Sequence, residues 1–212
     1  TLENEETGVG DVTISGGDIT ILSADDGVHA DRYLNISGGT INVTESYEGL
    51  EGNQITVSGG ETYVYASDDG VNAGAGIGLT PLLTQTGGLL FAAVPTSGDV
   101  DGIDSNGNLV ISGGTMIACG PTSSMGACAV DTDGSITVSG SATTLLVFGG
   151  SEATPSYGST ITKSSKSSTF SSGKAYTITY SSGSVTTGKL IAGYSSVTSY
   201  SGLGSISSVA AA

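Results

Sequence analysis

A Ser-Gly-Gly tripeptide, or a close variant of it, recurs six times along this chain of 212 residues. Its first glycines are Gly16, Gly38, Gly59, Gly87, Gly113 and Gly140, at intervals of 21 to 28 residues. Apolar residues mostly stand four and two positions before each glycine and three and five positions after it. This alternation on both sides of a fixed turn is typical of strands that bury one face.

The short interval between the tripeptides limits the fold. It leaves too little chain for a helix between strands, so we predict parallel strands that stack as a β-solenoid. Each coil would lie about 4.8 Å from the next and bury its inner face against its neighbours. Glycine suits the corners because it accepts positive φ. A β-sandwich is the alternative, but its strands would not carry one turn motif in one register six times.

The composition agrees with an all-β fold. Glycine accounts for 35 residues, tryptophan is absent and only 12% of the residues are charged, so good helix formers are scarce. We assign residues 1–157 to the solenoid repeats. Residues 158–212 are rich in Ser, Thr, Tyr and Gly, and we predict irregular coils or a strand cap in the same domain, because a solenoid must cover its exposed end. A disordered tail is the alternative.

The charge is strongly negative and unevenly distributed. The net charge is −15, and nineteen of the twenty acids lie between Glu3 and Asp133, where Arg32 is the only Lys or Arg. Nucleic acid is therefore not expected as a partner, because phosphate binding needs cationic side chains. The chain has no run of 18 apolar residues, so we predict no membrane span. Cations are the natural counter-charge.

A second corner follows 11 residues after the first in three coils, at Gly27, Gly49 and Gly70. Stacking of the coils would form a first column and, three residues further along, a second column. The first column is Asp26, Glu48, Asp69 and Asp101, and the second is His29, Glu51, Asn72, Asp104 and Asp131. Stacked like charges repel, and Ca²⁺ would neutralise them with its 6–8 oxygen ligands. A solvated acidic edge without a specific ion is the alternative.

Three phrases in this region are distinctive: "SADDGVHAD" (23–31), "TESYEGLEGN" (44–53) and "DGIDSNGN" (101–108). With the repeats over about residues 11–157, they resemble the clostridial carbohydrate-binding-domain family of secreted, right-handed parallel β-helices with a pectate-lyase-like fold. The resemblance implies an extracellular, calcium-binding β-helix that binds plant-type polysaccharide such as cellulose or polygalacturonate, without demonstrated lyase chemistry. The calcium-site acids of the family would correspond to Asp25, Asp26, Glu48, Glu51, Asp68, Asp69, Asp101 and Asp104.

An aromatic cluster is the candidate sugar site. Four residues after the corner glycine, the outward-facing positions are Thr20, Asn42, Tyr63, Phe91, Ile117 and Thr144. We predict that Tyr63, Tyr65 and Phe91 form an exposed cluster on consecutive coils, because exposed apolar patches usually bind a partner and aromatic faces suit sugar rings. Alternatively, the cluster packs under the insertion at 74–82 or against another subunit.

Two other functions stay open. Coils could continue from subunit to subunit as an extracellular fibre or adhesin, because residues 1–10 offer no obvious cap and residues 195–212 could add strands to a neighbour. A lyase would need a cationic base, and Arg32 is the one candidate in the repeats; we expect it in a structural ion pair and predict no enzymatic activity. Separately, a disulfide between Cys119 and Cys128 would close the loop at 120–127.

Overall fold

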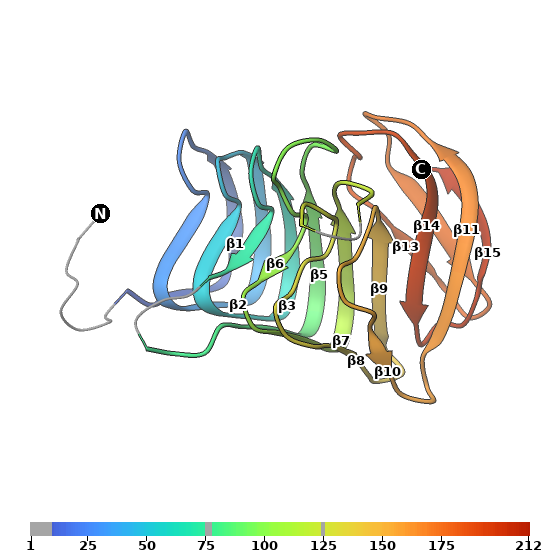
Figure 1. Ribbon diagram of the computed structural model, residues 1–212, viewed down its shortest axis with the longest axis horizontal. Coiled ribbons are helices and arrows are strands. Elements are labelled where there is room, and N and C mark those ends of the chain that lie inside the picture. Colours follow the sequence, from blue (N-terminus) through green and yellow to red (C-terminus); the bar gives the residue numbers. More distant parts are fainter. Residues whose placement is uncertain (1–9, 75–77, 124–125) are drawn as a thin grey trace.

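The structure is a computed structural model that describes residues 10–74, 78–123 and 126–212. The described residues form strands and turns without a helix, and the parallel strands stack as a β-solenoid of about five turns (Figure 1). The predicted all-β fold with a parallel solenoid is confirmed. A search of these same ranges for a helix long and apolar enough to cross a membrane finds none.

Six strands pair in parallel, each with its counterpart in the next coil. They are β1 (Val12–Leu22), β2 (Val28–Glu45), β3 (Leu50–Tyr65), β5 (Leu82–Ala93), β7 (Asn108–Cys119) and β9 (Thr143–Phe148). The first five bend at a Ser-Gly-Gly or Thr-Gly-Gly corner, where the second glycine has positive φ, as in Gly39 (93°) and Gly60 (80°). A Cβ added to Gly60 would lie 2.7 Å from the carbonyl oxygen of Gly39. The corners therefore require glycine for both conformation and space.

Shorter strands complete the later coils on another side of the solenoid. They are β4 (Val71–Ala73), β6 (Asp104–Ser105), β8 (Ile136–Val138) and β10 (Ser156–Tyr157). Strand β4 pairs with β3 and β6, and β8 pairs with β7 and β10. The acidic corners lie between these strands and the long strands, so the short strands help to hold the corner side chains in register.

An inner core fills the solenoid. Alternate residues of the long strands point inward, so Leu34 and Ile36 of β2 are buried beside Ile55 and Val57 of β3. Gln85 interrupts the apolar pattern yet is also buried, and its side-chain amide donates to the carbonyl oxygens of nearby corner residues at 3.0–3.3 Å. A polar residue is tolerated there because backbone acceptors satisfy its donors.

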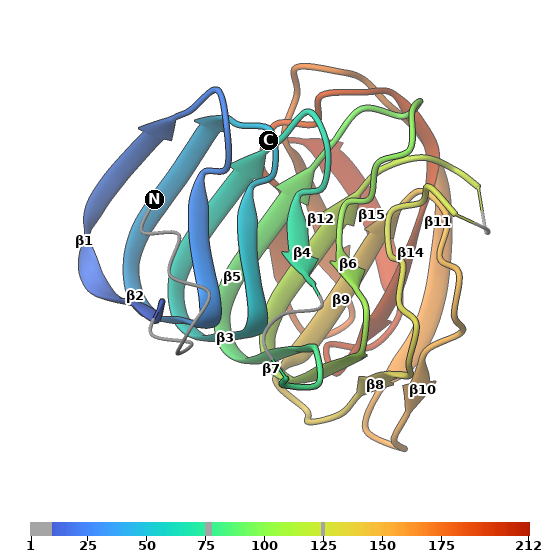
Figure 2. The same ribbon diagram turned by 60° about the vertical axis from the view of Figure 1, so that its left-hand side comes forward.

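The C-terminal module (residues 158–212) reverses the direction of the chain. Strand β14 (Tyr194–Ser201) pairs antiparallel with β9, and β11 (Thr162–Phe170) pairs antiparallel with β14, so both extend the main sheet. Strands β12 (Tyr176–Tyr180), β13 (Ser184–Thr186) and β15 (Ile206–Ala211) form a separate antiparallel sheet. Figure 2 shows these strands gathered at the end of the molecule opposite β1. Segment 195–212 thus pairs within its own chain, and residues 1–9 lie outside the described residues.

The separate sheet packs on the outside of the later coils and makes an outer core. In β5, Leu90 and Ala92 face the inner core, whereas Phe91 and Ala93 face the outer core with Tyr176 and other residues of the C-terminal module. Phe91 is fully buried. The prediction that Phe91 is exposed is therefore wrong, because the C-terminal module covers this face. The covering element was not anticipated, and residues 75–77 of the insertion lie outside the described residues.

Two smaller predictions also need correction. Ile117 lies opposite Leu146, not Thr144, and Thr144 is buried. The two cysteines are free thiols. Cys119 belongs to the outer core, whereas the thiol of Cys128 donates to the carbonyl oxygen of Val130 at 3.0 Å. The two cysteine side chains lie in different surroundings, so the predicted disulfide does not form in this structure.

Candidate functional site

A groove of about 710 Å³ lies between the solenoid and the C-terminal module. This volume falls in the range of roughly 300–1,000 Å³ that is usual for ligand sites. Strands β2 and β3 supply one wall, and two segments of the module supply the other. The lining residues are Asn42, Thr44, Tyr63 and Tyr65 on the first wall, and Ser172, Gly173, Ala175, Thr187, Gly188, Lys189, Leu190 and Ile191 on the second.

The groove lies where the outward-facing residues of the sheet change from polar to apolar and buried. The register aligns Thr20, Asn42, Tyr63, Phe91 and Ile117 across five coils. The first two are polar, and the last two are fully buried under the C-terminal module. Tyr63 stands at the boundary, half-buried. The groove therefore forms where the outer core ends and the solenoid surface becomes exposed.

Close contacts join the two walls of the groove. The hydroxyl oxygen of Tyr65 accepts a hydrogen bond from the backbone N–H of Lys189 at 3.1 Å. The rings of Tyr63 and Tyr65 lie 6.2 and 5.6 Å from the ring of Phe91, measured between centroids. Gly188 packs against this ring, because an added Cβ would lie 2.7 Å from its Cδ1 atom. Phe91 is thus the support beneath both tyrosines.

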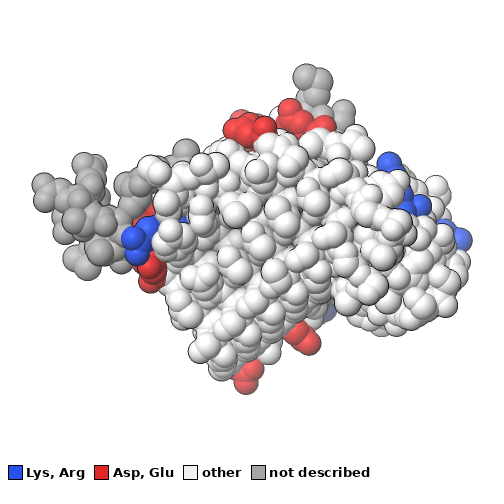
Figure 3. Space-filling view, turned by 90° about the horizontal axis from the view of Figure 1, so that it is seen from below, with Lys and Arg blue, Asp and Glu red and all other residues white. Residues whose placement is uncertain are grey.

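The groove combines aromatic and polar groups. Burial raises the pKa of Tyr63 and of Tyr65, so both hydroxyls stay protonated at neutral pH, and the Tyr63 hydroxyl donates to Glu61 at 3.3 Å. Lys189 is exposed at the rim. The C-terminal module has four lysines and no acid, and Figure 3 shows blue atoms on it while red atoms lie over the solenoid. The wall from the module therefore carries one positive charge, at Lys189.

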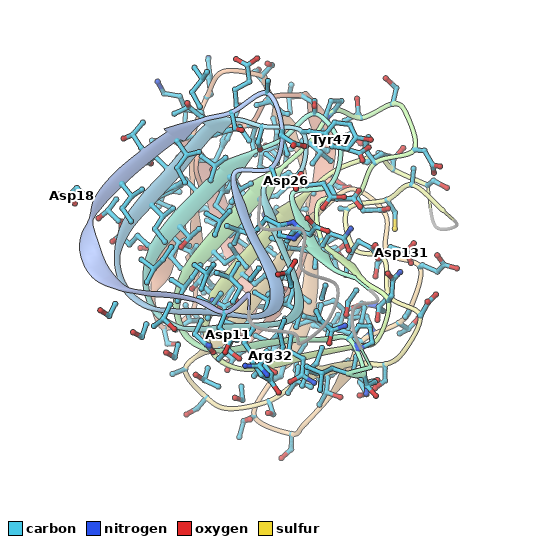
Figure 4. All side chains as sticks on the ribbon, turned by 90° about the vertical axis from the view of Figure 1, so that its left-hand side faces the viewer. Asp11, Asp18, Asp26, Arg32, Tyr47 and Asp131 are labelled. Carbon is cyan, nitrogen blue, oxygen red and sulfur yellow. The ribbon has the colours of Figure 1, made fainter. Side chains whose placement is uncertain are left out.

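The acidic corners form a second candidate site. Backbone hydrogen bonds stack the corners, from the N–H of Gly27 to the carbonyl oxygen of Glu48 at 2.8 Å, and from Gly49 to Asp69 at 2.9 Å. The strand register aligns the second column, with His29 opposite Glu51 and Asn72 opposite Asp104. The predicted columns are confirmed. Figure 4 shows Asp26, Tyr47 and Asp131 on one flank of the solenoid and Asp18 on the opposite flank.

The structure brings some of the predicted ligands closer together than others. Burial raises the pKa of Asp69 and Asp104 to about 7, with the charges of nearby acids adding to the effect. Burial also raises the pKa of Glu48 and Asp101. By contrast, Asp25 is exposed, and Asp68 interacts with the Tyr47 hydroxyl. Burial, with nearby acids adding to the effect, also raises the pKa of Glu51 to about 7. The crowded acids are thus Glu48, Glu51, Asp69, Asp101 and Asp104.

The crowded acids leave acceptor oxygens without donors. Asp69 accepts from the N–H of Asp101 at 2.8 Å, and Asp101 accepts from the N–H of Cys128 at 2.6 Å. The Asn72 amide donates to one oxygen of Glu48 at 3.1 Å. The other oxygen, Oε2 of Glu48, and Oδ1 of Asn72 are buried with no hydrogen-bond partner in the described part of the chain. Buried acceptors without donors are costly, and a hard cation would satisfy them.

Several residues at the corners were not among the predicted ligands. Asn72 and Asp131 stand in the second column, and a bridge between Val130 and Ser151 places Glu152 one coil beyond Asp131. Burial, followed by a hydrogen bond between its protonated form and Glu152, raises the pKa of Asp131 to about 6. The glycine pair 149–150 before Glu152 was a usable signal. The residues of the second groove wall could not be predicted from the sequence, because the C-terminal module does not follow the repeat.

Arg32 forms the expected ion pair. Its guanidinium donates to both carboxylate oxygens of Asp11, each at 2.8 Å, and Figure 4 shows the two residues side by side. The guanidinium also lies 4.9 Å from the ring centroid of Tyr33. The one cation of the repeat region is thus used in structural contacts.

Without divalent cations, the free energy of unfolding should fall as the pH rises from about 4 to about 7. Free aspartate has a pKa of about 3.9, whereas folding raises those of Asp69 and Asp104 to about 7. Between these values the folded state holds more protons than the unfolded state, so a rising pH destabilises it. Thermal melts in EGTA across this range would measure the trend, and Asp104→Asn should flatten it. A melting temperature that climbs with pH would contradict the assignment.

Comparison with known proteins adds one match. The family model described as carbohydrate-binding domain-containing protein matches residues 1–93. The match supports a carbohydrate-binding family. It covers the first wall of the groove, including Tyr63 and Tyr65, and the first coils of both acidic columns. No curated protein and no solved structure matches the chain.

Proposed function

We propose that this protein binds polysaccharide of the cellulose or pectin type in the groove, without catalysis. The observation that carries the proposal is the groove itself, in which two tyrosines on one strand face polar and cationic groups of the C-terminal module. The family match covers the strands that carry these tyrosines. Groove and match therefore support the same ligand class by independent routes.

The groove chemistry fits sugar rings. Flat aromatic faces cover the apolar C–H faces of a pyranose, and tyrosine hydroxyls offer hydrogen bonds at the edge. Thr44, Asn42 and the backbone of the module add donors and acceptors, and Lys189 would pair with the carboxylate of a uronate. Phe91 holds the tyrosines from below, so the site is preorganised before the ligand arrives.

Calcium is the proposed structural cofactor. Glu48, Asp69, Asp101 and Asp104, together with Asn72, provide the all-oxygen ligand set that Ca²⁺ prefers. The unpartnered oxygens of Glu48 and Asn72 support this choice. Because the ligands come from successive coils, a bound ion would hold those coils together and remove the repulsion between their charges.

An extracellular location is part of the proposal. Extracellular modules bind calcium with a Kd of roughly 10⁻⁴–10⁻³ M, which suits a partly exposed set of stacked carboxylates.

The absence of catalysis is supported by Arg32, which is held by Asp11 and unsuited to act as a base. Assembly into a fibre or adhesin is the alternative function. Lys163 and Lys166 argue against it, because they lie on β11 at the edge of the main sheet, and lysines on an edge strand disfavour pairing with another sheet.

Replacing both groove tyrosines, as Tyr63→Ala with Tyr65→Ala, should reduce retention on insoluble cellulose or on pectate gels at least tenfold, because the aromatic faces are lost. Retention on each polymer by pull-down is the measurement. Tyr157→Ala is the matched control, since Tyr157 is 46% exposed outside the groove. Retention of the double variant at the wild-type level, with its circular dichroism unchanged, would place the binding site elsewhere.

A further inference from the structure

Within the described residues, Asp26, His29 and Glu51 bring three potential metal-ligand atoms within 4.8 Å of one another. They come from two successive coils, with Asp26 and His29 on one and Glu51 on the next. The Nδ1 atom of His29 contacts Oε2 of Glu51 and lies 3.3 Å from Oδ2 of Asp26. His29 is the only histidine of the chain, so this corner differs in chemistry from every other corner.

Two carboxylates share one nitrogen of His29 in this arrangement. An imidazole nitrogen donates at most one proton, yet two carboxylates converge on Nδ1 of His29. The other ring nitrogen, Nε2, lies 3.4 Å from Oδ1 of Asp31. A metal-bound histidine commonly uses one nitrogen as ligand and donates the other N–H to a carboxylate. Asp31 occupies the position of that outer carboxylate.

We infer that Asp26, His29 and Glu51 form a site for a borderline divalent metal such as Zn²⁺, next to the calcium ligands but sharing no residue with them. One imidazole and two carboxylates match the nitrogen and oxygen ligands of Zn²⁺, whereas Ca²⁺ selects oxygen alone. The side chain of His29 is 47% exposed, so solvent can reach the cluster and water can supply the remaining ligands.

Two different metals would then bind along one flank of the solenoid. Asp26 and Glu51, which the family resemblance assigned to calcium, serve the borderline metal, and Glu48, Asp69, Asp101 and Asp104 remain for calcium. The argument does not depend on polysaccharide binding. The resulting site joins the coil of β2 to the coil of β3 at the corner where the columns begin.

The single histidine makes the test direct. Titration of the whole protein with Zn²⁺, in buffer that contains excess Ca²⁺, should shift the one set of imidazole NMR signals until a 1:1 ratio is reached. By calorimetry, His29→Gln should weaken Zn²⁺ binding at least tenfold and leave Ca²⁺ binding unchanged. Asp31→Asn should weaken Zn²⁺ binding about tenfold, as expected for an outer carboxylate. Asp18→Asn, on the opposite flank, should have no effect.

Two results would overturn the inference. One is an imidazole spectrum of the wild-type protein that does not respond to Zn²⁺, which is independent of how any variant folds. The other is equal Zn²⁺ affinity in the wild-type protein and in His29→Gln, which would show that acids elsewhere bind the metal. Melting curves in EDTA for each variant establish that the compared proteins are folded.

Discussion

Replacing Phe91 by alanine should lower the free energy of unfolding by about 3–5 kcal/mol. The side chain is fully buried between the solenoid and the C-terminal module, with Tyr63, Tyr65 and Gly188 around its ring. Its removal leaves a cavity at the contact that attaches the module to the third and fourth coils. Chemical denaturation of the two proteins would measure the difference.

The same substitution should also reduce polysaccharide binding, because the groove tyrosines lose their support. Leu22→Ala is the control: Leu22 is apolar and 75% exposed on the outside of β1, so its loss should change stability by no more than about 0.5 kcal/mol. A loss of under about 1 kcal/mol in Phe91→Ala would contradict the packing of the module on β5.

Removal of calcium should lower the melting temperature by about 5–10 °C. A ligand at 100 times its Kd stabilises the folded state by about 2.7 kcal/mol, and each kcal/mol corresponds to roughly 2–4 °C for a chain of this size. Differential scanning calorimetry at pH 8, with Ca²⁺ at about 100 times its Kd in one sample and EGTA in the other, would measure the shift. At this pH Asp69 and Asp104 are charged, so the ion has most repulsion to remove.

Variants locate the effect on the solenoid. Asp69→Asn keeps the shape of the side chain and should halve the calcium-dependent shift or reduce it further, because one charged ligand is lost. Asp18→Asn removes an equal charge from the opposite flank (Figure 4) and should leave the shift intact. Identical melting in Ca²⁺ and EGTA, with no metal found by elemental analysis, would rule out the calcium proposal.

The repeat made the solenoid and its corners predictable. Each glycine corner fixes where the strands on either side begin, and strand pairing then carries the register from coil to coil. This is why Asp26, Glu48 and Asp69 could be aligned from spacing alone. The alignment failed after Gly140, where the corner motif changes. Strand β9 is still parallel to β7 but pairs two residues further along, so Thr144 was placed where Leu146 lies.

The outer core escaped prediction for a different reason. The strands of the C-terminal module alternate serine, threonine and tyrosine, and such residues do not identify a buried face from pattern alone. A signal did exist on the solenoid side, because Phe91 and Ile117 continue an outward-facing series that starts with Thr20 and Asn42. Strands apolar on both faces are covered on both faces. Applied to β5 and β7, that rule would have predicted a covering layer.

Each coil carries its groove positions and its corner acids at different places in one repeat. Groove side chains follow the Ser-Gly-Gly corner, as Asn42 and Tyr63 do, and the acids precede the next corner, 11 residues after the first. One coil is therefore a unit that gene duplication or protein engineering can copy. A copy of 21 or 22 residues inserted between β2 and β3 would lengthen the groove by one strand spacing, about 4.8 Å, and extend each column by one residue. The same insertion would therefore increase both the length of polymer that the groove can bind and the number of metal ligands in the columns.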